Sequence, residues 1–161
     1  MSLKTKLKAE LLTSSGHGPR VLGMHEGELH LICELADVNP LAVELSKLVV
    51  TTPKLAKATI EQLAEISKKI SARVTYLLEA IGPVELDAES CTVQLRSVPP
   101  LREEEGTSYY EILVRRGGEV ALCRYQKMPS EPRRVIPAIV TREVLYRLAE
   151  DFEAVLLEFK L

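Results

Sequence analysis

Residues 109–127 read YYEILVRRGGEVALCRYQK, two strand-prone runs joined by a Gly-Gly pair. Aromatic and β-branched residues favour strands, and glycine accepts the positive φ angles of a tight hairpin turn. A two-residue turn at the glycines predicts strands over 109–116 and 119–127, with Val114 opposite Ala121. In that register one face of the hairpin is apolar and belongs to the core, because it also carries Tyr110, Ile112, Cys123 and Tyr125.

The opposite face of this hairpin mixes charged and apolar side chains. Besides Arg96 from the preceding strand, the same register places on it Glu111, Leu113, Arg115, Val120, Leu122 and Arg124. Leucines supply buried area to a partner, and the planar guanidinium of arginine pairs with carboxylate or phosphate groups. We therefore predict a surface that binds an extended peptide or an acidic ligand through Arg96, Leu113, Arg115, Leu122 and Arg124. The alternative is that the C-terminal helix or another subunit covers the leucines.

The rest of the chain shows further strands and helical segments. Hydrophobic periodicity predicts a helix at 3–12 and another that begins at Thr141 and carries an apolar stripe. Residues 41–52 fit both a helical face and a strand, and their β-branched end favours the strand. Period-two alternation bounded by turn residues predicts strands at 21–25, 28–36, 84–86, 91–98 and 135–140.

The longest predicted element is a helix over residues 53–81. Thr52 and Pro53 suit an N-cap and the first helical position, and neither Gly nor Pro follows until Gly82. At 1.5 Å per residue such a helix would be roughly 43 Å long. Apolar residues recur along it at spacings of three and four, at Leu63, Ile66, Ile70, Val74, Leu77 and Ile81.

The order of these elements predicts the fold class. Strands that arrive in hairpins, rather than alternating with helices, indicate an α+β fold. We expect antiparallel sheets built from hairpins, packed against one long central helix and a C-terminal helix. The chain fits one domain, 1–161, in which 1–19 form a short N-terminal helix and a linker.

The element order resembles that of the small dimeric type III secretion chaperones. That resemblance implies an acidic α+β protein that holds an extended partner segment and catalyses no reaction. The chain departs from the pattern in its extra C-terminal strands and its arginine-rich sheet face.

The composition predicts a globular cytoplasmic protein without a membrane segment. Apolar residues make up 46% of the chain and charged residues 27%, which excludes a disordered chain. The net charge of −2 disfavours a nucleic-acid partner. We find neither a signal peptide nor an apolar run near the roughly 20 residues of a membrane span. Three cysteines, at Cys33, Cys91 and Cys123, form no disulfide or zinc-ribbon pattern and fit a reducing compartment.

One metal-like grouping occurs in the sequence, at His25, Glu28 and His30. Around a Glu26-Gly27 turn, His25 would face Glu28, with His30 two residues further on the same face. Two imidazoles and a carboxylate suit Zn²⁺ or another divalent ion, although a polar hairpin tip explains the same residues. The sequence contains no nucleophile elbow, phosphate loop or calcium loop, so no residue is assigned a catalytic role.

These observations favour a non-catalytic intracellular binding or scaffold module that needs no cofactor. We expect a homodimer, since two-fold dimers are the commonest oligomers, and a protein or peptide partner. The alternative function is a metal-dependent enzyme that uses His25, Glu28 and His30.

Overall fold

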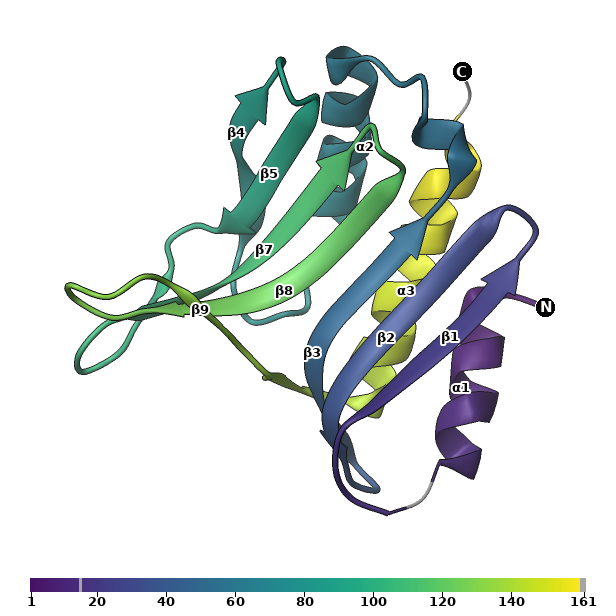
Figure 1. Cartoon of the computed structure of the whole chain (residues 1–161), viewed down its shortest axis with the longest axis vertical. Helices are drawn as coiled ribbons and strands as arrows, with labels where there is room; N and C mark the ends of the chain where they lie inside the picture. The colour runs from purple at the N-terminus through teal and green to yellow at the C-terminus, as the bar shows by residue number, and fades with distance from the viewer. Residues whose placement is uncertain (15, 160–161) are drawn as a thin grey trace.

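The computed structural model describes residues 1–14 and 16–159, and it confirms an α+β fold (Figure 1). Within these residues, ten strands form a single antiparallel sheet, and three helices lie against one of its faces. The helices are α1 (Leu3–Thr13), α2 (Ile60–Arg73) and α3 (Arg142–Glu158). The strands are β1 (Arg20–Glu26), β2 (Leu29–Val38), β3 (Ala42–Thr51), β4 (Ile81–Asp87), β5 (Thr92–Ser97), β6 (Leu101–Arg102), β7 (Thr107–Arg115), β8 (Glu119–Lys127), β9 (Arg134–Ile136) and β10 (Ala138–Thr141).

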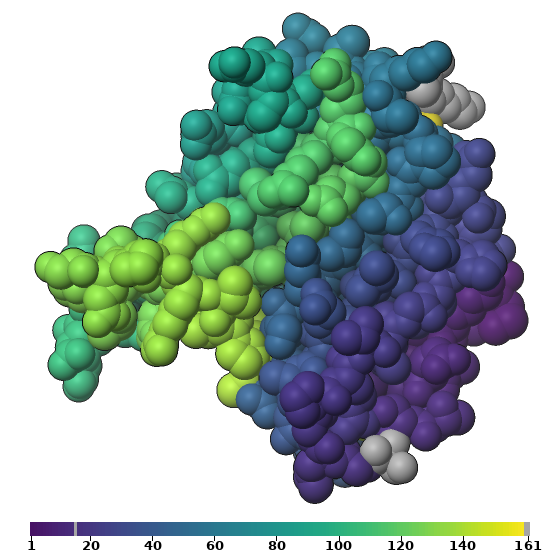
Figure 2. Space-filling model, in the orientation of Figure 1, coloured from purple at the N-terminus to yellow at the C-terminus, as the bar shows by residue number. Residues whose placement is uncertain are grey.

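Seven strands cross the sheet in the order β1-β2-β3-β8-β7-β5-β4, with β10 beside β3, β6 beside β7 and β9 beside β8. Strands β6 and β9, the adjoining ends of β7 and β8, and the loops that connect them form a projection that we call the arm, residues 101–109 and 125–136. Figure 2 shows its yellow-green part standing out from the body of the molecule. We call the sheet face opposite the helices the outer face.

The apolar core fills the space between the sheet and the helices. Leu3, Leu7 and Leu11 are fully buried, as their spacing of four along α1 requires. The backbone N–H of Leu3 donates to the Glu153 carboxylate of α3 at 3.2 and 3.3 Å, which links the first helix to the last. No helix in the described part of the chain is both long and apolar enough to cross a membrane.

The prediction of one long helix over 53–81 is wrong. The stretch opens with a 3₁₀ turn (Pro53–Leu55), and α2 then starts afresh after Thr59. Thr59 and Gln62 form a capping box, in which each side chain accepts a hydrogen bond from the other residue's backbone N–H. The helix ends at Arg73, because Val74 leaves helical geometry and Leu78 adopts a left-handed φ of 66°.

Two other predictions hold with refinements. Residues 42–51 form a strand, as their β-branched end favours. The predicted strand at 135–140 is divided by Pro137 into β9 and β10, which pair with different neighbours. Thr141 caps α3 by accepting a hydrogen bond from the backbone N–H of Val144 at 3.1 Å.

The register of the β7–β8 hairpin differs by one residue from the predicted one. Val114 pairs with Val120, because the turn holds three residues, 116–118, instead of two. Gly118 has φ 110°, its N–H donates to the Arg115 carbonyl at 3.0 Å, and its carbonyl accepts from Thr52 at 2.8 Å. A one-residue slip moves every side chain of one strand to the other face of the sheet.

The two glycines of this turn, Gly117 and Gly118, should differ in how well they tolerate a side chain. Gly118→Ala is expected to lower the free energy of unfolding by about 1–2 kcal/mol, because an L side chain resists positive φ. Its Cβ would also lie 3.0 Å from the Thr52 carbonyl oxygen. Gly117→Ala is the matched control, since a Cβ there meets nothing within 4 Å. Urea unfolding of both variants measures the difference, and equal losses would contradict the three-residue turn.

Candidate functional site

Three of the five side chains predicted to bind a partner lie on the outer face, and two do not. Arg96, Leu113 and Arg115 occupy outward positions of β5 and β7. Leu122 is 1% exposed and faces the core, and Arg124 follows it on the same side of β8. The placement of Leu122 and Arg124 on the outer surface is wrong, because the three-residue turn reverses the faces of β8.

Arg124 belongs to a buried polar network beneath the arm. Its Nη2 donates to the Glu79 carboxylate and to the Ser108 hydroxyl, both at 2.9 Å. The guanidinium carbon lies 4.5 Å from the centre of the Tyr110 ring, while Nη1 is buried without a hydrogen-bond partner. Ser97 donates to the same Glu79 carboxylate. The network therefore ties the segment before β4 to β5, β7 and β8.

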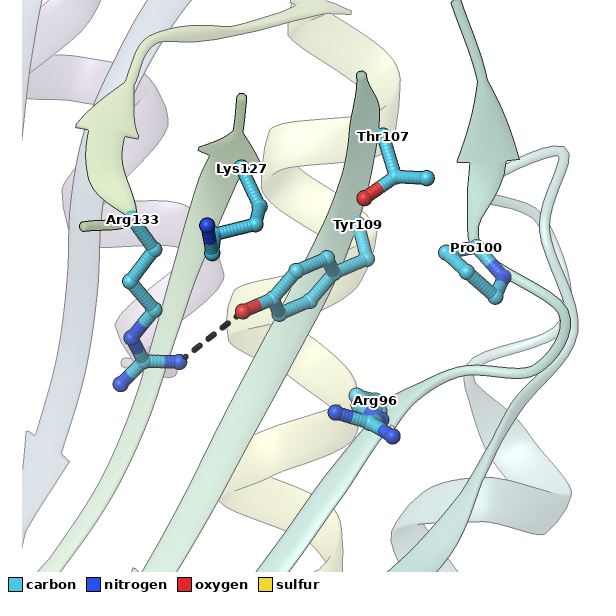
Figure 3. A pocket seen from close by; sticks show the side chains of 6 residues that line it. All are labelled: Arg96, Pro100, Thr107, Tyr109, Lys127 and Arg133. Atoms are coloured by element: carbon cyan, nitrogen blue, oxygen red, sulfur yellow. Dashed lines mark hydrogen bonds between the residues drawn. The ribbon is translucent and has the colours of Figure 1, made fainter. Parts of the chain in front are cut away.

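Side chains of the arm, together with Arg96 and Pro100 beside it, line a pocket of about 350 Å³, which we call the arm pocket (Figure 3). Figure 3 shows the Tyr109 ring between two groups, with Lys127 and Arg133 on one side and Arg96 and Pro100 on the other. Three of the six lining residues are cations and none is acidic; the lining consists of Arg96, Pro100, Thr107, Tyr109, Lys127 and Arg133.

Arg133 is held firmly at one wall of this pocket. Its guanidinium lies 3.8 Å from the Tyr125 ring centre, and Nη1 donates to the Tyr109 hydroxyl at 3.3 Å. The same nitrogen pairs with the carboxylate of Glu111, a side chain only 2% exposed that also accepts from Gln94 at 2.7 Å. Burial lowers the pKa of Arg133, but the hydrogen bonds to Glu111 and Tyr109 outweigh it and raise that pKa above its usual value. Arg133 therefore keeps its positive charge.

The other two cations have no carboxylate partner among the described residues. Arg96 stacks near Tyr109, with its guanidinium carbon 5.7 Å from the ring centre. The Lys127 ammonium donates to the backbone carbonyls of Met128, at 2.8 Å, and Glu131. These contacts position both side chains without cancelling their charges, so the arm pocket has an excess of positive charge.

Gly106 allows the backbone to hold Lys127 in this place. The glycine follows β6, where the arm turns back into β7, and a Cβ there would lie 2.3 Å from the carbonyl oxygen of Lys127. No side chain fits at that distance. The close approach of the two backbones therefore depends on glycine.

The structure brings together two members of the predicted metal site. His25 pairs with His30 across β1 and β2, and the imidazole rings stack with centroids 5.4 Å apart. The expected pairing of His25 with Glu28 is wrong, because the turn is formed by Gly27 and Glu28. Across residues 1–14 and 16–159, no three His, Cys, Asp or Glu side chains form a group suited to a metal ion.

All three cysteines are free thiols. Cys33 lies in the core, where burial raises the pKa of its thiol to about 12. Burial also raises the pKa of the Cys123 thiol, which is half-buried on the outer face opposite Glu111.

Sequence reasoning missed Tyr109, Lys127 and Arg133 as components of a site. The correct register aligns Tyr109 with Tyr125 on the outer face, so a three-residue turn would have indicated the aromatic pair and, two residues on, Lys127. Arg133 has no comparable signal, because it lies in the connection between β8 and β9.

Models of known protein families, curated proteins and solved structures all give no match to this chain. The chemistry of the arm pocket is therefore the basis for assigning a role.

Proposed function

We propose that the protein binds, without transforming, a ligand whose anionic group lies in the arm pocket. The excess positive charge of the pocket supports this proposal, since Arg96 and Lys127 carry no carboxylate partner in the described residues. A carboxylate or phosphate oxygen placed there would accept charge-assisted hydrogen bonds, which are about twice as strong as neutral ones.

The surroundings of Arg96 and Lys127 hold the binding groups in place before a ligand arrives. Lys127 is fixed by backbone carbonyls, and the Tyr109 ring beside Arg96 is fixed by Arg133. Groups already held in place lose little conformational entropy when a ligand arrives. The permanent charge of Arg133 favours electrostatic attraction over proton transfer.

Titration with inorganic phosphate and with acetate at low ionic strength, followed by amide chemical shifts, tests the pocket. We expect saturable shifts around Tyr109, and a Kd raised about tenfold or more in Arg96→Gln or Lys127→Gln, equivalent to about 1.4 kcal/mol. Arg115→Gln is the matched control, because Arg115 lies on the same face but pairs with Glu119 at 2.8 Å. Unchanged binding in both pocket variants would refute the proposal.

A further inference from the structure

A second hollow of about 190 Å³ lies next to the arm pocket on the outer face, over β5 and β7, and Arg133 lines both. Along β7 the outward residues of the second hollow are Leu113 and Glu111, and the next outward position, Tyr109, belongs to the arm pocket. Along β5 Thr92 and Gln94 lead in the same way to Arg96. The two hollows therefore follow one another along the strands, and we call the two together the groove.

The second hollow has the opposite charge. Glu85 and Asp87 of β4 line it together with Glu111, whose charge is already paired with Arg133. Glu85 makes no ion pair within the described residues. The Asp87 carboxylate accepts backbone hydrogen bonds from Glu89, at 3.0 Å, and Ser90. Hydrogen bonds from Ser90 and Glu89 lower the pKa of Asp87 below its usual value, so it is ionised at neutral pH.

The length of the groove matches a short extended peptide. Glu85, Gln94 and Leu113 lie in one cross-strand row, and Tyr109 lies four residues from Leu113 along β7. At about 3.3 Å per residue that is a span of about 13 Å, and side chains i and i+4 of an extended peptide lie on one face at the same spacing. A polyanion such as nucleic acid would meet repulsion from Glu85 and Asp87.

We infer that the ligand is an extended peptide segment with an acidic side chain in the arm pocket and a basic side chain about four residues away, beside Glu85 and Asp87. This inference rests on the proposed function, since it takes the arm pocket as the anion site. Leu113 lies at the Glu85 end, in the same cross-strand row, and gives the segment an apolar contact there. The ion pair of Arg133 with the buried Glu111 carboxylate lies between the two charged ends of the groove.

Calorimetry with blocked pentapeptides tests the inference on the intact protein. The dipolar peptides Ac-ETSTK-NH₂ and Ac-KTSTE-NH₂ present the charges in both orders, and Ac-ETSTQ-NH₂ lacks the base. We expect the better dipolar peptide to bind about tenfold more tightly than the acidic one. Glu85→Gln should remove this preference for the dipolar peptide. Glu89→Gln, an exposed carboxylate outside the groove, is the matched control and should keep the preference.

Different results would contradict the peptide inference and the proposed anion site. Equal affinity for dipolar and acidic peptides, or a preference that survives Glu85→Gln, overturns the peptide inference. Phosphate binding without any peptide binding also overturns it, while the arm pocket stands as an anion site. Absence of binding by phosphate, acetate and all peptides refutes the proposed function as well. Affinity that rises with each added acidic residue would identify a polyanion instead.

Discussion

Arg124→Leu is expected to lower the free energy of unfolding by about 3–5 kcal/mol, because it leaves Glu79 buried without its cation. The Arg124 and Glu79 side chains are only 11% and 14% exposed, so water can replace little of the lost interaction. Urea unfolding followed by circular dichroism gives the loss. Arg115→Leu breaks an exposed ion pair and is the matched control, with an expected loss below about 1 kcal/mol.

A double variant separates the ion pair from packing. Arg124→Leu combined with Glu79→Leu removes both charges, and Nη1 of Arg124 no longer lies buried without a partner. The double variant should therefore be more stable than either single variant. If Arg124→Leu costs no more than Arg115→Leu, the network beneath the arm does not stabilise the fold.

Phe152→Ala is expected to lower the free energy of unfolding by about 3–5 kcal/mol, since it deletes a ring from the core. Phe152 lies in α3, is fully buried and leads the largest fully buried side chains of the described chain. The size of the loss depends on how far the surrounding core side chains close the cavity. The same urea experiment measures it.

Leu157→Ala is the control for this substitution, on the same helix. Leu157 is 57% exposed, so its truncation should change stability by at most about 0.5 kcal/mol. A Phe152→Ala loss of similar size would show that α3 is not packed against the sheet as described.

The types of most elements were predictable because their signals are local. Helix α3 has a threonine cap followed by an apolar stripe, and β2 alternates buried with less buried residues. The prediction of one long helix failed, although the sequence indicates where α2 begins. Thr59 and Gln62 have the spacing of a capping box. The Thr52-Pro53 start and the absence of Gly and Pro before Gly82 favoured a single helix and concealed this box.

The candidate site was less predictable because it depends on one long-range contact. Whether the β7–β8 turn holds two or three residues is settled where Gly118 meets Thr52, 66 positions earlier in the chain. The error moved Arg124 to the surface and placed Tyr125, the partner of Tyr109, on the core face. Arg96 was found despite this error, because β5 lies beside β7 in either register. The proposed preference for an acidic ligand rests on Arg96, which the sequence indicated, and on Lys127, which the structure adds.

The three-residue turn at 116–118 also predicts how the chain tolerates insertions and deletions. Surface loops commonly accept a change of one residue, since their ends are free to adjust. Here, if a hairpin shortened by one residue kept a three-residue turn by taking Glu119 into it, Arg115 would pair with Val120, which would bring Arg124 to the solvent and Tyr125 into the core. In relatives of this protein, the length of this turn should vary less than its composition.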